Sequence, residues 1–120
     1  MTIALPWPPS ANRYWRKTKF GKVYVSDEAK QYREQVAVRC AAMRPFTGDV
    51  AVTLNFYRPT LQGDLDNRIK IPLDALSGFA WVDDKQVKKL DTELFLDRKN
   101  PRIVVGVKQH VPTEPKDGAP

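Results

Sequence analysis

The sequence predicts an α/β (α+β) fold: a single small domain in which two helices pack on a mixed β-sheet. Three observations lead to this fold class. The 120 residues, 42% of them hydrophobic, suffice for one compact core. Two segments repeat apolar residues at helical spacing, and several short segments alternate as strands do. We expect a domain over 1–108 and a flexible tail over 109–120, whose three prolines and low apolar content cannot repay the entropy of ordering.

The strands are predicted from alternation and from β-branched or aromatic runs. Ile3 to Trp7 is expected to form the first strand, which Pro8 ends because proline donates no ladder hydrogen bond. Two runs within 12–26 predict a hairpin with a solvated basic tip around Phe20. The remaining strands are expected over 49–58, 87–96 and 102–107, the last being apolar enough for a central position.

The two helices are predicted from spacing and capping. Ser26 is a good N-cap for a helix over 27–43, whose periodic apolar residues include Cys40 as a core position. Asp66 or Asn67 can cap a second helix that ends near Ser77-Gly78. Pro72 removes a backbone hydrogen bond inside it, so we expect a kink or a later helix start.

Composition limits the function classes. The net charge of +6 and pI near 9.6 favour a polyanionic partner, although a merely soluble basic surface is the alternative. One cysteine cannot form an intramolecular disulfide, and one histidine, His110, argues against His-rich zinc sites. Neither a signal peptide nor eighteen consecutive apolar residues occurs, so we expect a cytoplasmic protein with no membrane partner.

Acidic residues gather in two places within this basic chain. If the segment is extended, Asp64 and Asp66 share one side with Cα atoms about 6.5–7 Å apart. Like charges that close favour a hard cation such as Mg²⁺ between them. Asp83 or Asp84 offers a third carboxylate, and only one should serve because adjacent side chains diverge. The alternative is that all of these acids merely cap helices or lie in solvated turns.

Lys70 follows Asp66 by one helical turn. It either forms an ordinary surface pair with Asp66 or stabilises the charge that develops on a phosphate during hydrolysis. Asp74, one turn further, is interpreted as support for Lys70.

Basic residues cluster on the predicted hairpin among aromatic ones, a mixture that suits phosphate contact with base or sugar stacking. The alternative is that the aromatic side chains form the buried side of the hairpin. Lys85, Lys88 and Lys89 add positive charge beside Asp84. The candidate DNA-binding residues are Arg13, Arg16, Lys17, Lys19, Lys22, Arg68 and Lys85.

Four segments, "LPWPPSANRYWR", "VSDEAKQYREQV", "GDLDNRIKIPLDAL" and "GFAWVDDKQV", together resemble the RusA family of Holliday junction resolvases. The resemblance implies a homodimeric, often phage-encoded or prophage-encoded endonuclease that nicks four-way junction DNA symmetrically with Mg²⁺ or Mn²⁺. By matching motif it assigns metal binding to Asp64, Asp66 and Asp84, and catalysis to these acids and Lys70. The neutral residues before Asp64 and the proline at position 72 depart from the family pattern.

The sequence therefore predicts a Mg²⁺-dependent, structure-selective DNA endonuclease of recombination and repair. Two rivals stay open: a non-catalytic phage-type DNA-binding protein, and a nuclease that acts on flaps or other branched DNA.

Overall fold

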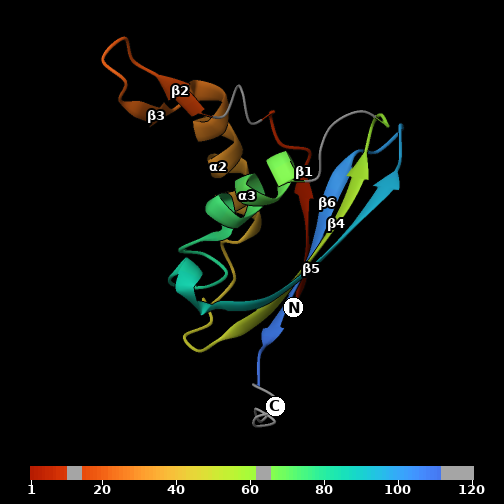
Figure 1. The fold of residues 1–120 in the computed structure, drawn as a ribbon. Helices are drawn as coiled ribbons and strands as arrows, with labels where there is room; N and C mark the ends of the chain where they lie inside the picture. Colours follow the sequence, from red (N-terminus) through yellow and green to blue (C-terminus); the bar gives the residue numbers. More distant parts are fainter. Residues whose placement is uncertain (11–14, 62–65, 112–120) are drawn as a thin grey trace, which may run out of the picture.

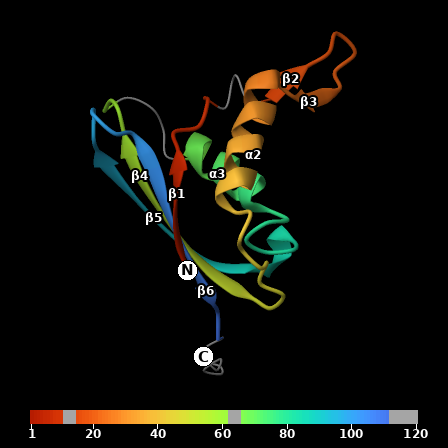
Figure 2. The ribbon, with the colours of Figure 1, turned by 180° about the vertical axis from the view of Figure 1, so that it is seen from behind.

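A four-stranded mixed sheet forms one layer of the molecule, and two helices lie on one of its faces (Figures 1 and 2). The computed structural model describes residues 1–10, 15–61 and 66–111. β4 and β5 pair in parallel, whereas the other neighbours are antiparallel. This arrangement confirms the predicted fold class. In sheet order the strands are β1 (Thr2–Pro6), β6 (Arg102–Gln109), β4 (Val50–Arg58) and β5 (Val87–Leu96).

Apolar residues alternate along β4, and those on one face of the strand form part of the hydrophobic core. Leu54 and Phe56 are fully buried beneath the helices, while Thr53 on the opposite face is exposed. β6 lies between β1 and β4, and its alternate residues Ile103 and Val105 join the same core. The central position predicted for this strand is confirmed, because only a strand covered by neighbours and helices buries so apolar a face.

β1 begins and ends one residue before the predicted strand. Trp7 therefore leaves the sheet, and its ring packs edge-on against Phe56 with 6.3 Å between centroids. The predicted hairpin is present as β2 (Trp15–Lys17) and β3 (Val23–Val25), which pair antiparallel in a separate two-stranded sheet. It projects from the body beyond the first helix (Figure 1).

That helix, α2 (Asp27–Arg39), begins as predicted. The Ser26 hydroxyl accepts a hydrogen bond from the Ala29 amide at 3.2 Å, which satisfies a backbone donor at the helix start. The predicted end at Met43 is wrong, since the chain turns after Cys40 and the Met43 amide bonds to the Cys40 carbonyl at 2.9 Å. Met43 still packs against the core, so apolar spacing continues through a turn. Burial raises the pKa of the Cys40 thiol, as the predicted core position requires.

The second helix, α3 (Asp66–Leu76), runs through Pro72. The later helix start, one of the two alternatives expected from Pro72, is therefore wrong. Pro72 is buried, and this packing compensates for the hydrogen bond that proline cannot donate. The helix ends near the predicted position: Gly78 adopts φ +90°, and its amide donates to the Trp81 carbonyl at 2.7 Å.

The ordered C-terminal part extends past the predicted boundary. β6 includes Gln109, and the His110 amide donates to the Asp49 carbonyl at 2.8 Å. Residues 112–120 of the predicted tail lie outside the described residues. Among those that the structure does describe, no helix is long and apolar enough to cross a membrane.

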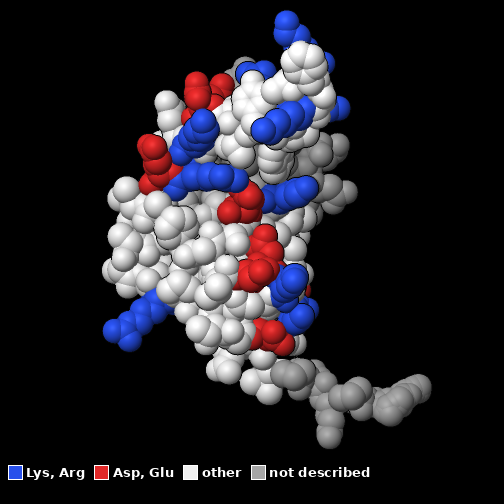
Figure 3. Space-filling model, turned by 90° about the vertical axis from the view of Figure 1, so that its left-hand side faces the viewer, with Lys and Arg blue, Asp and Glu red and all other residues white. Residues whose placement is uncertain are grey.

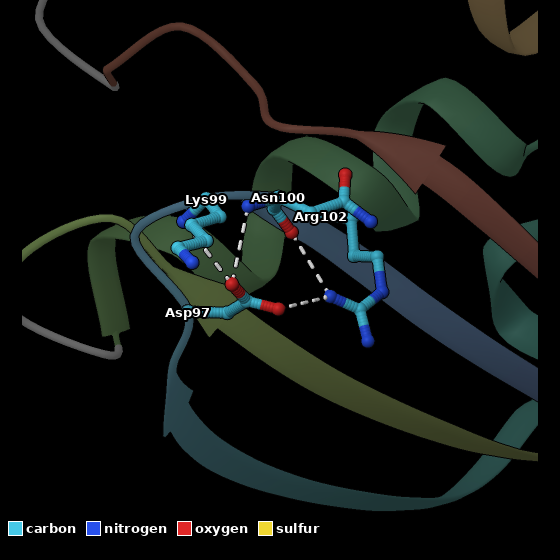
Figure 4. A network of polar contacts seen from close by, with 4 residues as sticks. All are labelled: Asp97, Lys99, Asn100 and Arg102. Carbon is cyan, nitrogen blue, oxygen red and sulfur yellow. Dashed lines mark hydrogen bonds and ion pairs between the residues drawn. The ribbon is translucent and has the colours of Figure 1, made fainter.

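A polar network closes the turn between β5 and β6 (Figure 4). Asp97 accepts hydrogen bonds from the Lys99 and Asn100 amides at 3.2 and 3.1 Å and from Arg102 at 2.9 Å. The Arg102 guanidinium also lies 4.0 Å over the Tyr57 ring centroid. The hydrogen bond from Arg102, followed by that from the Asn100 amide, lowers the pKa of Asp97 below its ordinary value.

We expect Asp97→Asn to lower the unfolding temperature at pH 7. A carboxyl whose folded pKa is lowered adds stability above its ordinary pKa and loses it as the pH falls through the folded value. The deficit of the variant should therefore shrink as the pH falls below about 4. Thermal unfolding of both proteins from pH 7 to pH 2.5, with Asp49→Asn as an exposed control, measures this. A deficit that is the same at every pH would contradict the ionic origin.

Candidate metal and nucleic-acid site

The start of α3 carries the first predicted group. Asp66 is the first residue of the helix, but its side chain and the whole of Asp64 lie outside the part that the structure describes. Arg68 and Lys70 follow on the same helix. Asp66 and Asn67, predicted as possible caps, lie within the first turn of the helix instead, and the pairing of Asp66 with Asp64 stays a prediction.

The two basic side chains in the first turns of α3, Arg68 and Lys70, each lie against a tryptophan ring. Lys70 Nζ lies 5.4 Å from the Trp15 ring centroid, and Arg68 Cζ lies 5.0 Å from the Trp7 ring centroid. Both distances are within the range in which an aromatic face attracts a cation. Trp15 begins the hairpin and Trp7 follows β1, so segments on both sides of residues 11–14 reach the first turns of α3.

Asp84 is held by a buried indole. Trp81 is fully buried, and its Nε1 donates to Asp84 Oδ1 at 2.8 Å. The Asp84 side chain is exposed, and Oδ2 meets no donor among the described residues. One carboxylate oxygen is therefore oriented by the protein while the other stays available, which suits an oxygen ligand for a hard cation.

The ambiguity between the two adjacent acids is resolved in part. Asp83 caps the short 3₁₀ helix η1 (Asp84–Gln86), accepting a hydrogen bond from the Lys85 amide at 2.9 Å. Its side chain thus closes the turn, which is the structural alternative predicted for one of the pair. Asp84 remains the open carboxylate.

Gln86 fixes this turn to the rest of the domain. Its Oε1 accepts from the Val82 and Asp83 amides at 2.9 and 2.8 Å. Its Nε2 donates to the Phe46 and Gly48 carbonyls, both at 2.7 Å. Sequence reasoning missed Gln86, although the spacing Asp83-x-x-Gln86 is that of a capping box and could have identified it.

Asp84 and Asp66 belong to segments that meet opposite ends of α3, and whether their carboxylates share one ion stays a prediction because the Asp66 side chain lies outside the described residues. A β-bridge joins Trp81 to Ser77, so the Asp84 turn lies at the C-terminal end of α3, whereas Asp66 begins the helix (Figure 1). At 1.5 Å per residue these ends are about 15 Å apart. Among the side chains that the structure describes, which do not include those of Asp64 and Asp66, no group of three His, Cys, Asp or Glu could hold a metal ion.

Asp74 has a different partner from the one its spacing suggested. Arg33 of α2 donates to Asp74 Oδ2 through Nε at 3.0 Å and through Nη2. This ion pair joins the two helices. Asp74 therefore helps to hold α3, and with it Lys70, against α2.

The predicted basic surface is present where it is described. Lys and Arg side chains gather at the end of the molecule that carries the hairpin (Figure 3). Both interpretations of the aromatics apply, because Trp15 packs against the core while Phe20 and Tyr24 are exposed. Arg13 lies outside the described residues. Exposed candidates are Arg16, Lys17, Lys19, Lys22 and Lys85.

Comparison with known proteins identifies a family. The model of the family described as endodeoxyribonuclease RusA matches residues 6–108. Proteins named crossover junction endodeoxyribonuclease RusA from Escherichia coli strain K12 and Enterobacteria phage 82 are each 40% identical to this chain. The two alignments cover 72% and 71% of this chain, and 75% and 74% of those proteins. The Shigella sonnei protein of that name is 38% identical over 72% of this chain and 75% of its own length.

We expect Gln86→Ala to lower the free energy of unfolding by about 1–3 kcal/mol, because it removes four hydrogen bonds and leaves two carbonyls without their donor. Urea unfolding followed by circular dichroism measures this. Gln35→Ala on the exposed side of α2 is the matched control and should change stability by less than about 0.5 kcal/mol. Equal stability of the two variants would show that Gln86 does not fix the Asp84 turn.

Proposed function

We propose that this chain, which belongs to the RusA family of endodeoxyribonucleases, cuts four-way junction DNA by metal-dependent hydrolysis of phosphodiester bonds. One observation carries the proposal: the family match over residues 6–108 spans the folded core and includes all four proposed catalytic positions. The open carboxylate of Asp84 and the cations on α3 support the same chemistry. Recombination and repair are the processes in which such junctions are resolved.

The proposed metal ligands are Asp64, Asp66 and Asp84, and the ion is Mg²⁺, with Mn²⁺ as a substitute. Carboxylate oxygens are the ligands that these hard cations prefer, and the Asp84 side chain offers one oriented and one available oxygen. A bound ion would polarise the phosphodiester and lower the pKa of an attacking water. The Trp81 indole holds the Asp84 carboxylate in place for such an ion.

Lys70 is proposed to bind and neutralise the phosphate. It lies one turn from Asp66 on the same helix face, and its ammonium is held by the Trp15 ring. A preorganised cation stabilises the negative charge that increases on the phosphate in the transition state. Lys70 is thus the electrostatic partner of the acids at the start of α3.

A homodimer with two-fold symmetry is proposed for the active form, because it presents identical sites to two opposite strands of a junction. The order of these residues along the fold supports a shared site: Asp66 begins α3, whereas the Asp84 turn is joined to the C-terminal end of that helix. An ion that binds oxygen at about 2.0–2.1 Å cannot bridge carboxylates at the two ends of a helix about 15 Å long. We therefore propose that each site takes Asp64 and Asp66 from one protomer and Asp84 from the other.

We expect Asp66→Asn to reduce nicking of a labelled four-way junction by about 100-fold or more in Mg²⁺. Junction binding in a gel shift should persist, because the basic surface is unchanged. Asp91→Asn, an exposed acid on β5, is the matched control and should cleave normally. Retained cleavage by Asp66→Asn would remove this residue from the mechanism.

The wild-type protein in the same assay separates the rival functions. Binding without nicks in Mg²⁺, Mn²⁺ and EDTA alike would identify a non-catalytic DNA-binding protein. Equal cleavage of flaps and junctions would identify a nuclease for branched DNA in general.

The shared site predicts complementation. A heterodimer of Asp66→Asn and Asp84→Asn protomers, isolated through two different tags, would keep one site in which all acids are intact. We expect this heterodimer to nick one strand of the junction, although each homodimeric variant is inactive. An inactive heterodimer would place all three acids of a site in one protomer, and failure to isolate any dimer would overturn the dimeric proposal.

A further inference from the structure

The tip of the β2–β3 hairpin carries an aromatic side chain that the fold does not use. Phe20 is 91% exposed and packs against no part of the hydrophobic core. The hairpin projects beyond α2 (Figures 1 and 2), and the exposure of the ring leaves its faces to solvent. Burial of this ring would require a bound partner.

The turn that presents Phe20 is closely hydrogen-bonded. The Thr18 amide donates to the Lys22 carbonyl at 2.8 Å, and the Gly21 amide donates to the Thr18 carbonyl at 3.0 Å. The Thr18 hydroxyl accepts from the Phe20 and Lys22 amides at 3.3 and 3.1 Å. Gly21 supplies the φ of +84° that the turn requires. The tip is therefore preorganised, which lowers the entropy cost of binding through it.

All charged residues of the hairpin that carries Phe20 are basic. Lys19 and Lys22 flank it, Arg16 and Lys17 continue along β2, and residues 15–25 contain no acid. A partner for this surface has to be anionic and has to offer a flat apolar face. Nucleic acid meets both conditions, since phosphates bind the lysines and bases stack on aromatic side chains.

We propose that Phe20 enters the branch point of a DNA junction and stacks on a base that has lost a neighbour there, while the flanking lysines bind phosphates on either side. This inference rests on the proposed function. In a continuous duplex, inserting a side chain between base pairs requires unstacking, which costs a few kcal/mol per step. At a branch point the stacking is already interrupted, so the ring binds without this cost. Phe20 would thus select branched over linear DNA.

Three variants separate stacking from charge. Phe20→Ala removes the ring, Phe20→Trp retains an aromatic face, and Lys19→Ala removes one phosphate contact. Dissociation constants of each for a four-way junction and for a linear duplex of the same sequence are measured in EDTA, which prevents cleavage. Unchanged circular dichroism spectra and unfolding temperatures show that the variants fold, as expected for an exposed ring.

We expect Phe20→Ala to weaken junction binding by about 5- to 100-fold, the equivalent of losing one stacked base. Its duplex binding should change by less than about twofold, because the phosphate contacts remain. Phe20→Trp should bind the junction as the wild-type protein does. Lys19→Ala should weaken both complexes and reduce the slope of log K against log salt by about one.

Permanganate oxidation of thymines beside the crossover gives an independent readout, since it attacks unstacked thymines. The wild-type protein should change this reactivity, and Phe20→Ala should not. Unchanged junction affinity of Phe20→Ala, or equal losses on junction and duplex, would overturn the inference while leaving the nuclease function intact. A wild-type protein that binds junction and duplex equally would also overturn the inference, whereas only a failure to nick the junction in Mg²⁺ or Mn²⁺ would overturn the nuclease function.

Discussion

The buried indole of Trp81 is the constraint on which much of this structure depends. An indole N–H without an acceptor inside a core costs free energy, and Trp81, fully buried, finds its acceptor in Asp84. The backbone of Trp81 also bridges to Phe46 and Ser77. One residue therefore packs the core, joins α3 to the chain that precedes β4, and orients a carboxylate at the surface. The packing of Trp81 in the core thus fixes the position of the Asp84 carboxylate.

The surface around the acids follows a different physical rule. A carboxylate facing an exposed cation neutralises it, whereas an aromatic ring attracts a cation and leaves its charge intact. Lys70 and Arg68 lie against tryptophan rings, so both keep charge that a phosphate can use. Arg33, which α3 needs for its attachment to α2, is instead paired with Asp74. The chain thus separates structural ion pairs from cations that are available to bind DNA.

Local patterns predicted most of the fold because the signals for those elements are local. The alternation in β4 and the capping serine before α2 each act within a few residues, so α2 begins where expected and β4 begins one residue later than predicted. Packing overrode the local signal elsewhere: Met43 continues the helical spacing but lies in a turn, and buried Pro72 is accommodated inside a helix. At Pro72 the tertiary environment outweighs a helix propensity about 3 kcal/mol less favourable than that of alanine.

The residues of the candidate site are predicted by the sequence and stay a prediction, whereas the contacts that the structure shows for some of them could not be predicted from sequence. Acids two residues apart and a lysine one turn later indicate phosphate and metal chemistry from sequence alone. The contacts that place these residues, such as Trp15 with Lys70, join segments far apart in the chain. The separation of Asp66 from Asp84 depends on where α3 ends and on the bridge between Ser77 and Trp81. A resemblance by motif order contains no information on that distance.

Trp15 links the two proposed DNA contacts. It begins the hairpin whose tip presents Phe20, and its ring lies beneath the ammonium of Lys70. Binding at the hairpin tip would restrain β2 and, through the Trp15 ring, the ammonium of Lys70. A substrate that engages the tip would therefore help to position the proposed catalytic lysine, whereas a duplex held by phosphate contacts alone would not. Because cutting needs a correctly placed charge, such coupling would link recognition of the junction at the hairpin tip to cleavage at the start of α3.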